Sequence, residues 1–206
     1  LKTLAPYLRL GDIMGRFLSQ LVDSSIISLE VESFGVVQEI KPVMLSLLKG
    51  LLKDITDNRI NYVNVLNVAK ERGVSIKFSY NSEPVSYSNL VKAIVKTDQG
   101  IFSLEACLFD EKLIKLTKIM DYHIDISPKG AMLLIHNKDI PGAVGKIGTV
   151  LGSFKVNIAE FILSRKSSGE VAYSIIKIDE QISLDVLQKI SEVEEIINIK
   201  QIIINE

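Results

Sequence analysis

The spacing of hydrophobic residues changes repeatedly along the chain between a helical period and the alternation of a strand. These changes predict the order of helices and strands. In the first 126 residues, apolar positions recur with helical spacing over 1–23, 39–55 and 61–72. Alternating or β-branched runs predict strands at 25–32, 74–80, 90–97, Ile101–Phe109, 112–120 and 123–126. A strand, two helices and then antiparallel strands predict an α+β domain.

Glycines mark several of the predicted boundaries. Gly11, followed by Asp12, could start or restart the first helix, and Gly50 is expected to be a mild weakness within the second. Gly73 is suited to cap the third helix in the left-handed conformation. Gly100 completes a short turn, 98–100, that predicts a hairpin between two strands.

A second domain is predicted after residues 127–130, where proline, glycine and charge separate two apolar runs. The predicted domains are therefore 1–126 and 127–206. The second reads strand 131–136, helix 141–154, strand 158–166, strand Val171–Ile178, helix Leu184–Ser191 and strand 197–204. This βαββαβ order is that of ferredoxin-like folds, in which both helices cover one face of the sheet. The other face is apolar and is expected to dock on another domain or subunit.

The loop before the first helix of this second domain carries the clearest candidate chemistry. Pro141 suits a first helical turn, and Gly142 leaves the backbone N–H groups there accessible. Such N–H groups and the positive end of a helix dipole favour an anion such as a carboxylate. Asp139 nearby could bind an ammonium group, so the loop predicts an amino-acid site. The structural alternative for Asp139 is a neighbour of the helix N-cap or a simple loop charge.

Composition narrows the function classes. The 206 residues carry 24 basic and 25 acidic side chains without a polybasic run, which argues against nucleic acid or a membrane surface as the main partner. No apolar run is long enough to span a bilayer, and no signal-peptide pattern is present. A single cysteine, Cys107, excludes an internal disulfide and is expected to be a buried thiol. The chain begins at Leu1 rather than methionine, so we expect a piece of a longer protein.

Two longer stretches resemble a known family. HNKDIPGAVGKIGTVLG, continued by VNIAEFILSR and GEVAYSIIKID, resembles the ACT domain, a small amino-acid-sensing module. LAPYLRLGDIMGRFLSQL and YVNVLNVAKERGV resemble the C-terminal region of long-type D-3-phosphoglycerate dehydrogenases. In that region an intervening domain, the allosteric substrate binding domain, precedes the ACT domain. The resemblance covers essentially the whole chain.

The resemblance implies a cytoplasmic enzyme, or one in an organelle stroma or matrix, that is homo-oligomeric. It implies oxidation of 3-phosphoglycerate with NAD in serine biosynthesis, and feedback inhibition by L-serine bound between ACT domains. No G-x-G-x-x-G follows a strand here, because the glycines at 142, 145, 148 and 152 have another spacing inside a helix. We therefore expect the catalytic domains and the NAD site to lie outside this chain, which should have no cofactor or activity of its own.

The resemblance also implies a set of effector-binding positions for L-serine: Asn137, Asp139, Gly142, Ala143 and Asn157. Asn157 has one acceptor and two donors and could contact both amine and carboxylate, and its structural alternative is a turn residue. The sequence departs from the family pattern at Asn137, often aromatic or histidine, and at Ile140, often arginine. These departures bear on which effector binds. His136 alternates with Asn137 and is expected to face the core.

Other sites are weaker. Lys70 and Arg72, at the end of the third helix, could bind a phosphate-like anion, although cations at a helix C-terminus are often only solvated. His123 has no neighbouring residues at metal-ligand spacing, so no metal is expected. Two alternatives to the dehydrogenase fragment stay open. One is the regulatory part of an iron–sulfur L-serine dehydratase, and the other is a structural dimerisation module with a degenerate ligand site.

Overall fold

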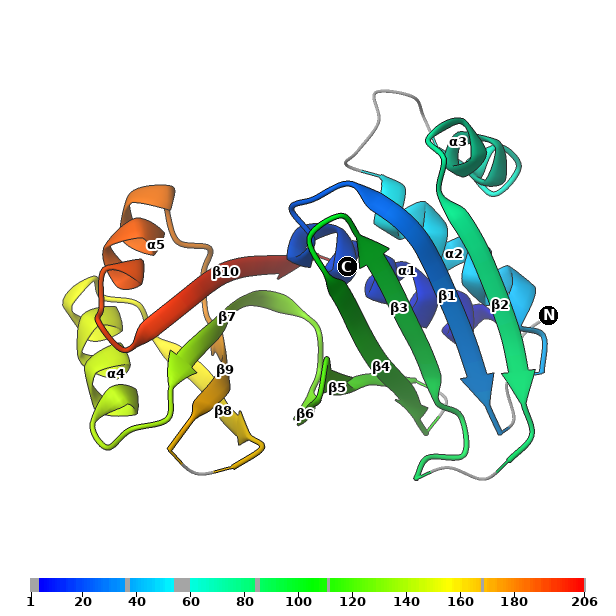
Figure 1. Ribbon diagram of the computed structural model, residues 1–206. Coiled ribbons are helices and arrows are strands. Elements are labelled where there is room, and N and C mark those ends of the chain that lie inside the picture. The colour runs from blue at the N-terminus through cyan, green and yellow to red at the C-terminus, as the bar shows by residue number, and fades with distance from the viewer. Residues whose placement is uncertain are drawn as a thin grey trace. The chain divides into compact units, whose positions relative to one another are not determined.

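The computed structural model describes residues 4–35, 38–53, 60–83, 86–110, 112–167 and 169–205. The chain forms two compact units (Figure 1). The first comprises Leu1–Met120 and Asp125–Pro128, and the second comprises Asp121–Ile124 and Lys129–Glu206. Within the described residues, no helix is long and apolar enough to cross a membrane, and no group of three or more His, Cys, Asp or Glu residues could hold a metal ion.

The first unit contains five strands and part of the sixth of a six-stranded sheet, with helices α1 and α2 over one face (Figure 1). Its elements are α1 (Ala5–Leu21), β1 (Ile26–Phe34), α2 (Ile40–Leu52), α3 (Val65–Glu71), β2 (Ser75–Asn81), β3 (Val91–Thr97), β4 (Ile101–Phe109) and β5 (Leu113–Ile119). The sixth strand, β6 (Tyr122–Ile126), is divided, with residues 122–124 in the second unit and 125–126 in the first. The strand order is β2-β1-β3-β4-β5-β6. The α+β class is confirmed. However, β2 pairs with β1 in parallel, because the connection through α2 and α3 returns the chain to the same end of the sheet.

Glycines hold α1 and α2 in close contact. A Cβ added to Gly15 would lie 2.0 Å from the carbonyl oxygen of Leu47, and one added to Gly50 would lie 2.5 Å from that of Asp12. Gly11 approaches Val43 in the same way. The expected restart at Gly11 is wrong, since α1 runs through it without a break. Gly50 is a point of helix–helix contact and not merely a weak position in α2.

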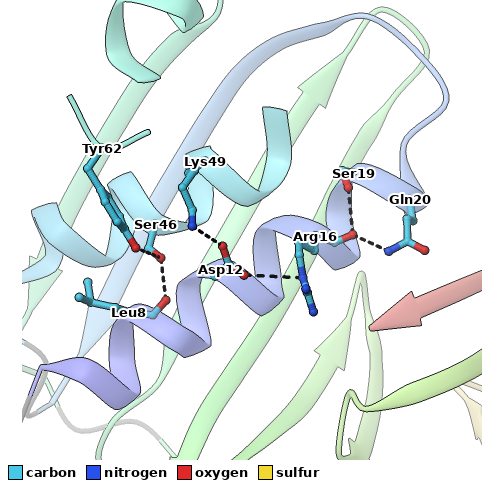
Figure 2. A network of polar contacts seen from close by, with 8 residues as sticks. All are labelled: Leu8, Asp12, Arg16, Ser19, Gln20, Ser46, Lys49 and Tyr62. Carbon is cyan, nitrogen blue, oxygen red and sulfur yellow. Dashed lines mark hydrogen bonds and ion pairs between the residues drawn. The ribbon is translucent and has the colours of Figure 1, made fainter. Parts of the chain in front are cut away.

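Polar contacts also join α1 to α2, and α2 to Tyr62 (Figure 2). The buried Ser46 hydroxyl donates to the carbonyl of Leu8 at 2.7 Å and lies 3.3 Å from the Tyr62 hydroxyl. The Lys49 ammonium binds Asp12 at 3.0 Å and stands 5.1 Å from the centre of the Tyr62 ring. These contacts prevent α1 from sliding along α2 or rotating against it, whereas the glycines determine the distance between the two helices.

The sheet of the first unit also buries the single cysteine. Cys107 on β4 is 1% exposed, and burial raises the pKa of its thiol to about 11. The thiolate is the reactive form, so Cys107 is unreactive at neutral pH. The expectation of a buried core thiol is confirmed.

The second unit has the predicted βαββαβ order. Its elements are β7 (Gly130–Lys138), α4 (Ala143–Ser153), β8 (Ile158–Arg165), β9 (Val171–Ile178), α5 (Leu184–Ser191) and β10 (Ile196–Ile204). The strand order β10-β7-β9-β8 is antiparallel throughout. Both helices pack on one face around a core that includes Leu133, Ile135, Ile147, Leu151, Ile176 and Ile190 (Figure 1). The ferredoxin-like fold class is confirmed.

Candidate functional site

The Pro-Gly pair forms a tight turn in front of α4. Gly142 has φ 91° and ψ −17°, and the N–H of Ala143 donates to the carbonyl of Ile140 at 3.2 Å. With Pro141 before it, this is a type II turn, which requires a residue with positive φ at its third position. The predicted helix start at Pro141 is therefore wrong, and α4 begins at Ala143. Gly142 is needed for its backbone conformation as well as for access.

The turn changes which N–H groups could receive an anion. The N–H of Ala143 is engaged in the turn, and the N–H of Lys146 donates to the carbonyl of Gly142 at 2.9 Å. The N–H groups of Val144 and Gly145 lie between them, at the positive end of the α4 dipole. A carboxylate at this helix start would therefore meet Val144 and Gly145. Ala143 itself is buried, with its methyl group in the core.

Asn137 lies inside the second unit. It is 1% exposed, on the face of β7 that meets the helices. Its Oδ1 accepts from the Ser174 hydroxyl at 2.8 Å, and its Nδ2 donates to the carbonyl of Lys138 at 2.9 Å. A ligand could reach this amide only by replacing those partners. The effector role expected of Asn137 stays a prediction, and its structural role is to satisfy a buried hydroxyl.

His136 occupies the opposite face of β7, which α4 and α5 do not cover. Its ring stacks on that of Tyr173 with centroids 4.8 Å apart, and burial lowers the pKa of its imidazole. The expectation that His136 faces the helix-covered core is wrong, because Leu133 and Ile135 alternate with it and fill that core. The same burial raises the pKa of Tyr173 to about 12, so both rings are neutral near pH 7.

Asp139 ties the end of β7 to the hairpin between β8 and β9. Its Oδ2 accepts from Arg165 Nη1 and from the N–H of Gly169, both at 3.2 Å. Its own N–H donates to the carbonyl of Glu170 at 3.2 Å. The carboxylate is 12% exposed and already neutralised by Arg165. Binding an ammonium group here would mean sharing or displacing that arginine.

Asn157 is exposed at the far end of α4. The helix closes with bonds from the N–H of Val156 to the carbonyl of Leu151 and from the N–H of Lys155 to that of Gly152, both at 3.0 Å. This is the Schellman motif, and Lys155 takes its left-handed position with φ 58°. Asn157 follows directly, and its Nδ2 donates to Asp179 Oδ2 at 2.7 Å. Both residues line a polar pocket of about 390 Å³ that also includes Glu180 and Gln181.

Changing Lys155 to glycine is expected to stabilise the second unit slightly, by about 0.5 kcal/mol. A non-glycine residue at positive φ costs about 1–2 kcal/mol, and the greater freedom of glycine in the unfolded chain offsets part of that gain. Thermal unfolding of the variant measures the difference. The matched change at Ser153, in the same helix end with an ordinary helical backbone, should destabilise instead.

Sequence reasoning missed an ion pair next to the turn. Lys146 on α4 binds Glu195, which lies 49 positions away in the turn before β10. This contact lowers the pKa of the Glu195 carboxyl, and the backbone carbonyl of Glu195 accepts from the backbone N–H of Lys138 at 2.8 Å. The pair borders an open groove of about 540 Å³ lined by Gly142, Gly145, Lys146, Thr149, Val150 and residues 193–195. No local sequence signal links the two residues.

The predicted anion residues lie in the first unit. Lys70 and Arg72 are exposed at the end of α3, where the N–H of Gly73 donates to the carbonyl of Lys70 at 3.0 Å. Gly73 has φ 71°, as expected for the predicted cap. The role of Lys70 and Arg72 in binding an anion stays a prediction.

The effector residues of the second unit lie at opposite ends of its sheet. Strand register pairs Lys138 with Val171 at one end, beside Asp139, and Ile158 with Ile178 at the other, beside Asn157. The eight residues of β9 separate these ends by roughly 20 Å or more. A free amino acid is much smaller, so one copy of the chain cannot bring Asp139 and Asn157 onto the same ligand.

Comparison with known proteins identifies relatives along the chain. Residues 3–120 match the family of D-3-phosphoglycerate dehydrogenase intervening domains. The chain is 31% identical to the D-3-phosphoglycerate dehydrogenase of Synechocystis over 94% of its length and 29% identical to that of Methanocaldococcus jannaschii over 92%. It is also 32% identical to the Mycobacterium tuberculosis enzyme over 88%. It spans only 35–36% of the length of these relatives. Among solved structures, an ACT domain from a GTP pyrophosphokinase of Chlorobium tepidum matches 35% of this chain and 96% of its own, at 21% identity and a TM-score of 0.27.

Proposed function

Because this chain belongs to the D-3-phosphoglycerate dehydrogenase intervening-domain family, we propose that it is the regulatory and oligomerising part of such an enzyme, and that it senses L-serine. The parent enzyme would use NAD and would act in serine biosynthesis in the cytoplasm or in an organelle. The catalytic and NAD-binding domains would belong to the rest of the parent chain, since the relatives are almost three times as long. Serine would act on them through linkage between two conformations.

The observation that carries the proposal is the separation of Asp139 and Asn157 within one sheet. Two second units placed side by side in antiparallel orientation would bring the turn at 140–143 of one copy close to Asn157 of the other. The N–H groups of Val144 and Gly145, for which the described residues supply no acceptor, would then bind the carboxylate of serine. Asn157 would meet its amino group from across the interface. A homo-oligomer is therefore part of the site.

Strand β8 offers an edge for such an assembly. It is the outer strand of the β10-β7-β9-β8 sheet, so one side of its backbone has no partner within the sheet. Leu163 on β8, with Ile140 and Val144 near the start of α4, are each more than 40% exposed. Apolar side chains beside an open sheet edge favour pairing with a second copy.

We expect Asn157→Ala to weaken L-serine binding about tenfold, because it removes a hydrogen bond to a charged group. Isothermal titration of the 206-residue chain with L-serine measures the affinity, and sedimentation with and without serine measures assembly. Asn198→Ala, at an exposed asparagine on β10, is the matched control and should leave binding unchanged. No serine binding by the unaltered chain at millimolar concentration would contradict the sensor function.

One set of contacts favours the structural alternative, a dimerisation module with a degenerate site. Asn137 is bonded to Ser174 inside the core, and Asp139 is bonded to Arg165 and Gly169. Both are thus used within one copy. Sedimentation showing a dimer that no serine concentration alters would favour this function over the sensor.

A further inference from the structure

The amide of Asn157 has a fixed orientation. Its Nδ2 donates to Asp179 Oδ2 at 2.7 Å. An ionised carboxylate has no hydrogen to give, so Asp179 can bond only to the NH₂ side of that amide. The carbonyl oxygen Oδ1 is therefore turned away from Asp179. Asn157 is exposed, so this oxygen can accept a hydrogen bond from outside the unit.

The backbone around Asn157 supports the same orientation. The Schellman motif at the end of α4 directs the chain from Lys155 into β8, and Ile158 then pairs with Ile178 beside Asp179. Asn157 and Asp179 thus stand next to each other at the ends of neighbouring strands. Their hydrogen bond follows from strand register and does not depend on a long flexible side chain.

The electrostatic surroundings favour a cationic ligand group. The pocket is lined by two acidic residues, Asp179 and Glu180, and by one basic residue, Lys155, so negative charge is in excess there, and it lies at the C-terminal, negative end of α4. An acceptor oxygen in such a field suits an ammonium group better than a carboxylate. The start of α4, with its N–H groups at Val144 and Gly145, has the opposite preference. The two half-sites therefore differ in the charge that each selects.

We propose that Asp179 is a positioning residue of the effector site: it holds Asn157 so that its carbonyl oxygen selects the amino group of the ligand. This inference rests on the proposed function and adds to it. Without Asp179 the amide of Asn157 could rotate and present either its oxygen or its NH₂ group. The site would then lose its preference for a ligand with an amino group.

The test compares L-serine with 3-hydroxypropionate, which has the same carboxylate and hydroxyl but no amino group. The unaltered chain should bind L-serine much more tightly in isothermal titration. Asp179→Ala should weaken L-serine about tenfold and leave 3-hydroxypropionate within about twofold, so that the ratio of affinities shrinks. If Asp179 had only a structural role, the Asp179→Ala change would weaken the binding of both ligands alike.

Two further variants separate orientation from charge. Asp179→Asn keeps the size of the side chain but adds an NH₂ group, so residue 179 could bond to either end of the Asn157 amide, and this variant should lose most of the discrimination. Glu180→Ala removes a neighbouring charge from the same pocket without touching the bond and should bind both ligands nearly as before. The inference is overturned if Asp179→Asn keeps the full discrimination of the unaltered chain, or if Glu180→Ala produces the same loss as Asp179→Ala.

Nuclear magnetic resonance gives a readout that needs no ligand. The side-chain NH₂ signals of Asn157 should show a bonded hydrogen in the unaltered chain, and Asp179→Ala should shift them toward the values of a solvated amide. Unchanged signals would contradict the orientation. If the unaltered chain binds no serine, the proposed function fails. If the chain binds serine and Asp179→Ala leaves the affinity unchanged, only this inference is overturned.

Discussion

Gly15→Ala is expected to destabilise the first unit by about 3 kcal/mol, near the upper end of the cost of overpacking. The added methyl carbon would lie 2.0 Å from the carbonyl oxygen of Leu47, 2.7 Å from the nitrogen of Leu51 and 2.9 Å from the Cα of Gly50. All three are backbone atoms, so no side chain can rotate away, and α1 and α2 must separate. Separation would loosen the buried layer formed by Leu10, Met14, Leu47 and Leu51.

Thermal and denaturant unfolding of the 206-residue chain measure this effect. The transition of the first unit should fall by on the order of 10 °C, whereas that of the second should stay in place. Gly148→Ala in α4 is the control, since nothing lies within 4 Å of its added carbon. It should stabilise its helix by about 0.5–1 kcal/mol, in keeping with ordinary helix propensity. Equal effects of the two changes would show that the helices do not meet at Gly15.

Asn137→Ala is expected to destabilise the second unit by about 2–3 kcal/mol. The change leaves the fully buried Ser174 hydroxyl without its acceptor and removes a donor from the carbonyl of Lys138. A buried polar group that loses its partner costs about 1–3 kcal/mol, and the missing side chain leaves a cavity. Denaturant unfolding followed by circular dichroism measures the loss.

A double variant separates the hydrogen bond from the cavity. Asn137→Ala combined with Ser174→Ala should cost less than the sum of the two single changes, because no unpaired hydroxyl remains. Asn198→Ala, at an exposed position on β10, should change the free energy of unfolding by less than about 0.5 kcal/mol. If Asn137→Ala leaves stability unchanged but abolishes serine binding, its amide faces the ligand and the buried arrangement is wrong.

The order of elements could be predicted because each has a clear period. β3 alternates buried and less buried residues, and the βαββαβ order of the second unit requires only that strands and helices be told apart. Turn chemistry was equally local: Gly73 caps α3, and Gly100 closes the hairpin with its carbonyl 2.8 Å from the nitrogen of Thr97. Such features depend on neighbours in sequence, which a single chain displays directly.

Pairings between distant residues could not be predicted in this way. The parallel pairing of β2 with β1 depends on how the connection folds back, and Gly15 gains its importance only from Leu47 on another helix. From sequence alone, a glycine in a helix is expected only to lower the stability of that helix, because its neighbour in space is unknown. Lys146 and Glu195 likewise meet only through the tertiary fold.

The candidate site shows the same division. Its loop could be found from Pro141 and Gly142, because their backbone preferences are intrinsic. The side of β7 that Asn137 occupies could not, since an asparagine in a strand fits a polar surface as well as a satisfied core position. Whether Asp139 is available depends on Arg165, which reaches it from a different strand.

The distance between Asp139 and Asn157 also makes ligand binding depend on the concentration of the protein. A ligand that requires both residues binds two chains at once. The fraction of sites that it occupies therefore depends on the concentration of the protein as well as on the concentration of the ligand. Dilution would weaken apparent affinity without any change in the site, and the ligand would tighten chain pairing by the same factor. A cell that makes less of the protein would then need more of the ligand for equal occupancy. Titrations at several protein concentrations would reveal that dependence directly.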